Sequence, residues 1–163
     1  MDLFEILSEI YKDYETTIET RNDGDYYGDI DYFVIINPHG SNNIEVSNPR
    51  EEGIIFWFSY QHAHFDYCDD MQDNIEDLIE YINDFLEDRR ASIEFLDGDT
   101  PLFGGDRNPD DIDTSSGESI LKDFVADNDS LYKQVKRDLE GIACRCSIRG
   151  WSGKHDRDIN FVL

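Results

Sequence analysis

The hydrophobic positions of this 163-residue chain repeat with two different periods. Apolar side chains recur every three or four residues in segments 2–14, 73–88 and 116–139, which predicts amphipathic helices. The polar run 127–130 divides the last of these segments into two helices. Other segments are apolar at alternate positions or throughout, as strands are. The predicted strands are residues 32–36, 44–47, 54–58, 91–96, 142–149 and 159–163.

The order of these elements predicts the α+β class, with helices packed on one face of a mostly antiparallel sheet. Short turns join the three strands between residues 32 and 58, so these strands should form an antiparallel meander. Residues 54–58 are apolar on both faces of the pleat, which is typical of an interior strand covered on both sides. No internal repeat or linker divides the sequence, so we expect a single domain spanning residues 1–163.

Two segments are predicted to be loops with functional potential. Residues 97–117 are rich in Gly, Pro, Asp and Ser, and a loop of that length within a compact domain is expected to be either functional or mobile. His62, His64 and Asp66 follow the apolar strand 54–58, so their side chains should stand on a loop at its end. A polar loop held by hydrogen bonds is the simpler interpretation of this segment, and a binding or metal site is the alternative.

The composition adds a strong charge imbalance. The chain has 38 acidic and 14 basic residues, a net charge of -24, and 39% hydrophobic residues, which is enough for a packed core. Residues 1–140 hold 36 acidic and 10 basic side chains, whereas residues 141–163 hold 2 and 4. Such an acidic surface repels phosphate, which disfavours direct nucleic-acid binding, and it attracts a basic protein partner. The basic residues of the last segment form a small island: Arg145, Arg149, Lys154 and Arg157.

The sequence also indicates a cytoplasmic protein. No hydrophobic run is long enough to span a membrane, and the first residues lack the basic and apolar regions of a secretion signal. The three cysteines are odd in number, and Cys144 and Cys146 alternate onto one face of a predicted strand. Together with Cys68, they are expected to be buried free thiols without a disulfide framework.

The H-x-H-x-D spacing of His62, His64 and Asp66 resembles part of the zinc-binding motif of the metallo-β-lactamase fold. That motif continues with a histidine where this chain has Tyr67, and few further imidazoles remain to complete such a site. The resemblance implies a metal-dependent hydrolase, which His155 could assist, as an alternative function. The shortage of histidines favours a protein without a metal or another cofactor.

Two further segments carry a resemblance to a group of bacterial proteins. They are residues 56–66, in which Phe-Trp-Phe leads to His-Ala-His-Phe-Asp, and residues 149–156, Arg-Gly-Trp-Ser-Gly-Lys-His-Asp. With the helix 73–88 and the strand 91–96, they resemble immunity proteins of bacterial polymorphic toxin systems, over roughly half of the chain. The resemblance implies a cytosolic bacterial inhibitor or accessory protein, although Gly150 stands where that group has Ser. We expect one cluster from the two segments: His62, His64, Asp66, Trp151, Lys154 and His155.

The resemblance and the acidic surface together predict a non-enzymatic immunity protein, or antitoxin. It would neutralise a basic toxin such as a nuclease by occluding the active site with carboxylates and aromatic rings. A DNA-mimic inhibitor of a DNA-binding enzyme and the metal-dependent hydrolase are the alternatives. The predicted contact residues are Tyr26, Tyr27, Asp29, Asp31, Asp66, Asp69 and Asp70.

Overall fold

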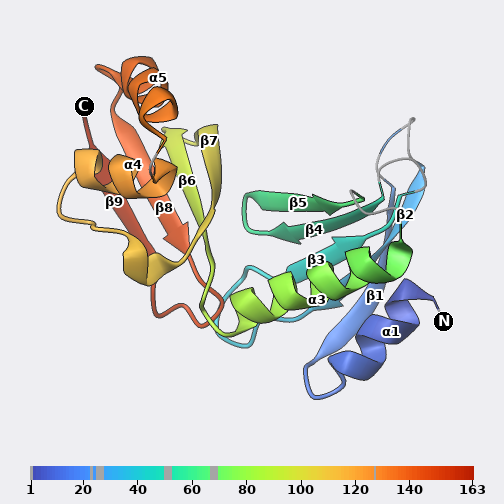
Figure 1. Ribbon diagram of the computed structural model, residues 1–163. Coiled ribbons are helices and arrows are strands. Elements are labelled where there is room, and N and C mark those ends of the chain that lie inside the picture. Colours follow the sequence, from blue (N-terminus) through green and yellow to red (C-terminus); the bar gives the residue numbers. More distant parts are fainter. Residues whose placement is uncertain (1, 23, 25–27, 50–52, 67–69, 127) are drawn as a thin grey trace. The chain divides into compact units, whose positions relative to one another are not determined.

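The computed structural model describes residues 2–22, 24, 28–49, 53–66, 70–126 and 128–163. The chain divides into two compact units, residues 1–84 (unit 1) and residues 85–163 (unit 2). Each unit contains an antiparallel sheet and helices that pack on it (Figure 1). Within the described residues, no helix is both long enough and apolar enough to cross a membrane.

Unit 1 is an antiparallel meander flanked by helices. Its elements are α1 (Leu3–Ile10), β1 (Thr16–Asn22), β2 (Asp29–Ile35), β3 (Ile44–Ser47), β4 (Ile54–Phe58), β5 (Gln61–Phe65) and α3 (Met71–Leu86). Each strand pairs with the next one in the chain, in the spatial order β1-β2-β3-β4-β5. The predicted meander of β2, β3 and β4 is therefore confirmed, and β4 is an interior strand as expected.

One face of this sheet is apolar and is covered by α1 and α3. Because side chains alternate between the faces of a strand, the register places Phe33, Val46 and Phe56 on the same face. All three are at most 1% exposed. The ring of Phe4 on α1 lies 6.3 Å from that of Phe33, and Tyr81 on α3 packs edge-on against Phe56 at 4.9 Å. Burying each such side chain contributes about 1.5–3 kcal/mol, so this face anchors both helices.

Unit 2 is a second antiparallel sheet with helices on one face. Its elements are β6 (Ala91–Asp97), β7 (Thr100–Arg107), the 3₁₀ turn η1 (Pro109–Asp111), α4 (Gly117–Val125), α5 (Asp129–Leu139), β8 (Cys144–Arg149) and β9 (Arg157–Phe161). The spatial order is β7-β6-β8-β9, and every neighbouring pair is antiparallel. The predicted division of the last helical segment into two helices is confirmed by α4 and α5.

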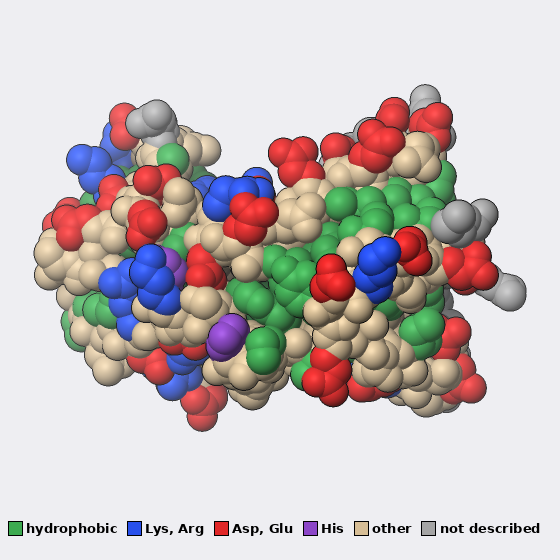
Figure 2. Space-filling view, turned by 90° about the horizontal axis from the view of Figure 1, so that it is seen from below, with side chains coloured by type: hydrophobic (Ala, Val, Ile, Leu, Met, Phe, Trp, Pro, Cys, Tyr) green, Lys and Arg blue, Asp and Glu red, His purple; other side chains and the backbone are tan. Residues whose placement is uncertain are grey.

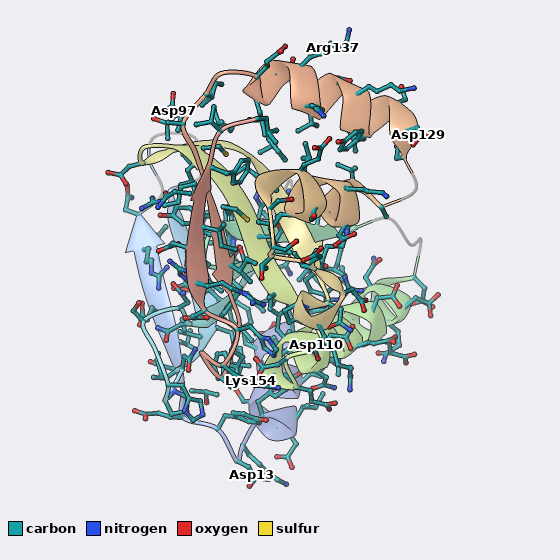
Figure 3. All side chains as sticks on the ribbon, turned by 90° about the vertical axis from the view of Figure 1, so that its left-hand side faces the viewer. Asp13, Asp97, Asp110, Asp129, Arg137 and Lys154 are labelled. Atoms are coloured by element: carbon teal, nitrogen blue, oxygen red, sulfur yellow. The ribbon has the colours of Figure 1, made fainter. Side chains whose placement is uncertain are left out.

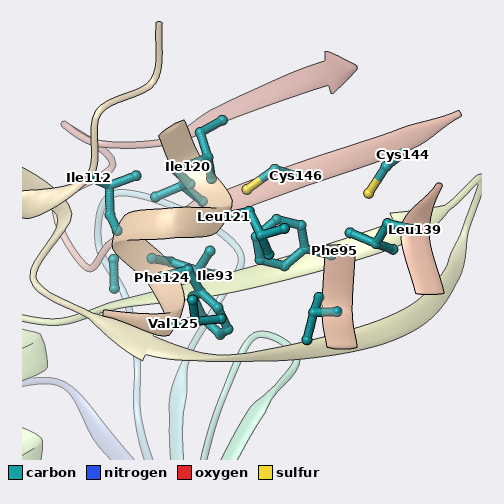
Figure 4. Packing of buried hydrophobic residues seen from close by; sticks show 13 residues of the cluster. Ile93, Phe95, Ile112, Ile120, Leu121, Phe124, Val125, Leu139, Cys144 and Cys146 are labelled. Carbon is teal, nitrogen blue, oxygen red and sulfur yellow. The ribbon is translucent and has the colours of Figure 1, made fainter. Parts of the chain in front are cut away.

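Phe95 on β6 stands at the centre of the unit 2 core. Its ring packs against Phe103, Phe124 and Phe161, at centroid distances of 4.3, 5.2 and 6.3 Å. These partners come from β7, α4 and β9, so one ring holds three other elements together. Figure 4 shows the surrounding cluster, in which apolar side chains of α4 and α5 meet the apolar face of the sheet.

Cys144 and Cys146 reach this cluster from β8 as free thiols that are at most 1% exposed (Figure 4). Burial raises the pKa of the Cys146 thiol to about 12, so it stays protonated at neutral pH. The prediction of buried free thiols is confirmed for these two residues, while Cys68 lies outside the described residues.

The α+β class, the antiparallel pairing and the packing of helices on one sheet face are confirmed. The strands form two sheets, however, where the sequence pattern led us to expect one. Local patterns identify strand segments, but the choice of partner depends on segments far apart in the chain, such as β6 and β8. The expectation of a single domain stays a prediction.

Three strands differ from the sequence-based prediction. β5 occupies most of the segment expected to be a loop around residues 62–66, β7 lies within the expected loop 97–117, and β1 was not expected. All three are edge strands, where polar side chains and glycines are tolerated because one edge of the strand has no partner. The prediction of a loop is therefore wrong for residues 61–65 and 100–107, whereas residues 112–116 lie outside the helices and strands as expected.

Candidate binding surface

The acidic side chains are concentrated in unit 1. Residues 1–84 hold 21 acidic and 3 basic side chains, and residues 85–163 hold 17 and 11. Unit 1 thus carries 18 of the 24 net negative charges. In Figure 2, Asp and Glu side chains border an area of hydrophobic side chains. Such a surface suits a protein partner of opposite charge.

A groove of about 500 Å³ lies between α1 and the sheet edge formed by β1 and β2. Its apolar surface comes from Phe4 and Ile18, and Ile18 is 54% exposed. The acidic side chains around it are all exposed. We name it the α1 groove and define it by Asp2, Phe4, Glu5, Glu9, Ile18 and Asp31.

The local sequence explains why these groups meet. At the start of α1, the backbone N–H of Asp2 donates to Glu5 Oε2 at 3.1 Å, which holds both residues at the helix N-terminus. Asp31 lies two residues before Phe33 on β2, so the two side chains share the face on which α1 packs. The hydroxyl of Thr20 on β1 donates to Asp31 Oδ1 at 2.6 Å and fixes that carboxylate.

The α1 groove combines an apolar surface with carboxylates, which is the combination that a lysine or arginine side chain can use. The aliphatic stem can lie on Phe4 and Ile18 while the cationic head meets the surrounding carboxylates. Glu9 already pairs with Lys12 at 2.9 Å, but both side chains are mostly exposed. Exposed ion pairs of this kind contribute little, so a partner can replace it at small cost.

The opposite face of the unit 1 sheet carries a polar and aromatic strip. Arg21 on β1 donates to Glu19 at 2.7 Å and to Glu45 at 2.6 Å. Its guanidinium also lies over the ring of Tyr32, 4.6 Å from the centroid. The hydrogen bond with Glu45 is the main cause that raises the pKa of Arg21 above its ordinary range. Arg21 is thus a permanently charged group bound to internal partners.

β5 places both predicted histidines on this same face. The register sets His62 opposite Trp57 and His64 opposite Ile55. The His62 ring stacks on the Trp57 indole at 4.9 Å and meets the His64 ring edge-on at 5.4 Å. Both histidines are exposed, and so is Asp66 directly after the strand.

The stack with Trp57 is the arrangement of these histidines that the structure shows. Within the described residues, no three His, Cys, Asp or Glu side chains are grouped so that they could hold a metal ion. The metal-dependent hydrolase that would use His62, His64 and Asp66 stays a prediction.

Neither a protein-family model, nor a curated protein, nor a solved structure matches this chain. The resemblance of residues 56–66 and 149–156 to immunity proteins therefore stays an expectation. Evidence on function comes from the α1 groove and from the charge of unit 1.

Trp151, Lys154 and His155 lie in the turn between β8 and β9 of unit 2. Trp151 and His155 are buried, and Lys154 is exposed. His155 Nδ1 lies 3.9 Å from Asp110 Oδ1, and Figure 3 shows Lys154 and Asp110 at the same end of the unit. The other half of the predicted cluster, on and after β5, belongs to unit 1. The proximity of the two halves stays a prediction.

Four of the predicted contact residues are described. Asp29 and Asp31 are exposed on β2, and Asp31 lines the α1 groove. Asp66 is exposed beyond β5. Asp70 has a structural role, because its Oδ1 accepts the backbone N–H of Gln72 at 2.8 Å and caps α3. The other predicted contacts, Tyr26, Tyr27 and Asp69, lie outside the described residues.

Sequence reasoning missed the part of the groove that α1 supplies. Glu5 and Glu9 are one helical turn apart, so their spacing indicates one acidic face of the helix. No local pattern shows that this face meets Asp31 and Ile18, because that depends on how α1 packs on the sheet.

Two of the four side chains of the basic island predicted near the end of the chain form ion pairs inside unit 2. Arg145 lies 3.1 Å from Asp99, and Arg149 lies 2.7 Å from Asp158. Lys154 is exposed.

Proposed function

We propose that this chain is a non-enzymatic binding protein that receives a basic protein partner on unit 1. The observation that carries the proposal is the α1 groove, where four carboxylates surround an exposed apolar surface in the more acidic unit. A partner's lysine or arginine would find a surface for its stem and a counter-charge for its head. In finer terms, we propose an immunity protein, or antitoxin, that occludes the active site of a basic toxin such as a nuclease.

Electrostatic attraction would guide such a partner to unit 1. Clustered charge of one sign raises association rates by roughly 10 to 1000-fold at low ionic strength. The screening length at physiological salt is about 8 Å, so the guidance weakens as salt is added. Ion pairs in the groove from which water is excluded are screened less than exposed charges. Salt should therefore slow association more than it speeds dissociation.

A row of carboxylates on α3 supports a second candidate, the DNA-mimic inhibitor of a DNA-binding enzyme. Asp73, Glu76 and Glu80 are exposed and follow one another at intervals of three and four residues. With a rise of about 1.5 Å per residue, these charges repeat every 4.5–6 Å or so along the helix. This interval is of the order of the charge spacing along a nucleic-acid strand.

The test uses a purified basic candidate partner, recovered by pull-down from the native host, with binding kinetics measured at 50 and 300 mM salt. We expect the double variant Glu5→Lys with Asp31→Lys to weaken binding by about a hundredfold or more, because like charges at a contact cost several kcal/mol. The matched control is Asp129→Lys with Asp138→Lys on α5, which changes the net charge equally outside unit 1. It should weaken binding less than about threefold at 300 mM salt.

Equal weakening by both double variants would show that net charge alone attracts the partner, and the groove assignment would be wrong. Inhibition assays on the same mixtures separate the candidates. Loss of the partner's nuclease activity supports the antitoxin. Loss of DNA binding by a partner that has no nuclease activity supports the DNA mimic. A stoichiometric transition metal in untagged protein, together with hydrolytic activity, would contradict the non-enzymatic proposal.

A further inference from the structure

Glu94 is a buried carboxyl group on an interior strand of unit 2. It lies on β6 between Ile93 and Phe95, whose side chains belong to the core under α4 and α5. Because side chains alternate along a strand, Glu94 points to the opposite face of the sheet. The residue is nevertheless only 5% exposed, so water has little access to it.

The Glu94 carboxyl group lies against the backbone of β7. The register sets Gly104 of β7 and Ser147 of β8 beside it. A Cβ atom at residue 104 would lie 2.2 Å from the Glu94 carboxyl carbon, so the carboxyl group occupies the space that a side chain at this position would take. In the described part of the chain, no group forms a hydrogen bond or an ion pair with this carboxyl. Ser92, on the same face, is 1% exposed and its Oγ also lacks a described partner.

The charged groups that share this face are bound to partners of their own. They come from β7, β8 and β9 and from the residue before β6. When Glu94 is neutral, the positive and negative charges of these ion pairs cancel. When Glu94 is ionised, it adds a negative charge that has no counter-ion. The ion pairs are Arg145–Asp99, Arg149–Asp158 and Arg90–Asp106.

Burial raises the pKa of Glu94 to about 7, from an ordinary value of 4.5. A carboxyl group with a higher pKa in the folded chain binds its proton more tightly there than in the unfolded chain. The stability that this proton confers is fully present below about pH 4.5. It is lost as the pH rises to about 7, and no further loss follows above that.

We propose that Glu94 is a proton switch in unit 2: the neutral carboxyl lets β7 pack against β6, and its ionisation loosens this pairing. A buried carboxylate without a counter-charge is costly, and the nearest relief is water admitted between Glu94 and Gly104. Among the strands that the structure describes, β7 pairs only with β6 and lies at the sheet edge, so it is the strand that can move. The switch does not depend on the proposed partner of unit 1.

The first test follows urea unfolding of the full chain from pH 4.5 to 8, with amide hydrogen exchange of β6 and β7 as the local readout. In the unmodified protein, the unfolding constant of unit 2 should rise on the order of a hundredfold over this range. Glu94→Gln is neutral throughout and should lack this rise. Asp97→Asn, which removes an exposed carboxylate from the same strand, should keep it. All ionisable groups other than Glu94 and Asp97 are shared by the three proteins.

If Glu94→Gln does not fold, a second measurement on the unmodified protein tests the proton switch. The ¹³C resonance of the Glu94 carboxyl, assigned through its bonded carbons, should titrate with a midpoint near pH 7. Exchange of the β7 amides should then accelerate beyond its intrinsic pH dependence. A midpoint near 4.5, or an unchanged pH dependence in Glu94→Gln, would overturn the switch.

Discussion

At the scale of single residues, Gly117 shows how closely atoms are fitted in unit 2. It is the first residue of α4, and a Cβ atom there would lie 2.2 Å from Cδ2 of Phe161 on β9. Space is therefore the reason for glycine at this position. An added methyl group must push α4 away from β9 or turn the ring out of its contact with Phe95.

We expect Gly117→Ala to lower the free energy of unfolding by about 1–3 kcal/mol, because overpacking outweighs the better helix propensity of alanine. Gly40→Ala is the control, since the nearest atom to its added Cβ would be Asn37 Nδ2 at 3.9 Å. Gly40→Ala should change the free energy of unfolding by less than about 0.5 kcal/mol. Urea unfolding of the two variants and the unmodified protein measures both effects. Equal stabilities would mean that the Phe161 ring moves aside freely.

Some residue-scale features could be predicted from the sequence and others could not. The burial of Cys144 and Cys146 follows from their alternation with polar residues along one strand. Glu94 occupies a polar position of such an alternation, so the pattern predicts exposure. Its burial depends on neighbouring strands and on the absence of a side chain at Gly104. The alternation of polar and apolar residues gives no information on either feature.

At the scale of elements, the interior strands were predictable and the edge strands were not. β4 is apolar on both faces: Ile54, Phe56 and Phe58 are buried on the face that α3 covers, and on the other face Ile55 is buried and Trp57 is partly buried. β5 alternates Phe65 and Ala63 with His64 and His62, but the pattern is short and its polar half is exposed. The exposed half of β5 gains little from burial, so the stacking of His62 on Trp57 helps to stabilise the pairing of β5 with β4. Ring stacking between strands cannot be seen in the hydropathy of a single segment.

The cap of α5 provides a test at this scale. Asn128 Oδ1 accepts the backbone N–H of Leu131 at 3.0 Å. Asn128→Ala should lower the free energy of unfolding by about 1 kcal/mol, because a helix N-terminus loses one of its hydrogen-bond acceptors. Ser130→Ala, an exposed change in the same turn, should alter it by less than about 0.5 kcal/mol. Chemical denaturation compares the two, and a similar effect of both would argue against the cap.

At the scale of the whole molecule, charge is the property that composition alone predicts. A net charge of -24 sets a preference for basic partners and a repulsion within the chain. The position of the α1 groove could not be predicted. Asp31 and Ile18 were visible in the sequence, but the groove exists because α1 packs beside β1 and β2.

We expect added salt to stabilise the protein. Raising the salt concentration from 10 mM to 0.15 M shortens the screening length from about 30 Å to about 8 Å. This weakens the repulsion among the 21 acidic residues of unit 1. Calorimetry should show a Tm several degrees higher, and a smaller rise in the partly neutralised variant Asp73→Asn with Glu76→Gln. A fall in Tm would mean that ion pairs such as Arg21–Glu45 outweigh the repulsion.

The buried thiols of unit 2 make its opening chemically detectable. Burial raises the pKa of both Cys144 and Cys146, and both lie in the core beneath α4 and α5. A thiol reagent can therefore modify them only in molecules whose helices have lifted from the sheet. The labelling rate therefore measures how often the native protein opens in this way. An oxidant would react with these thiols only in the molecules that open.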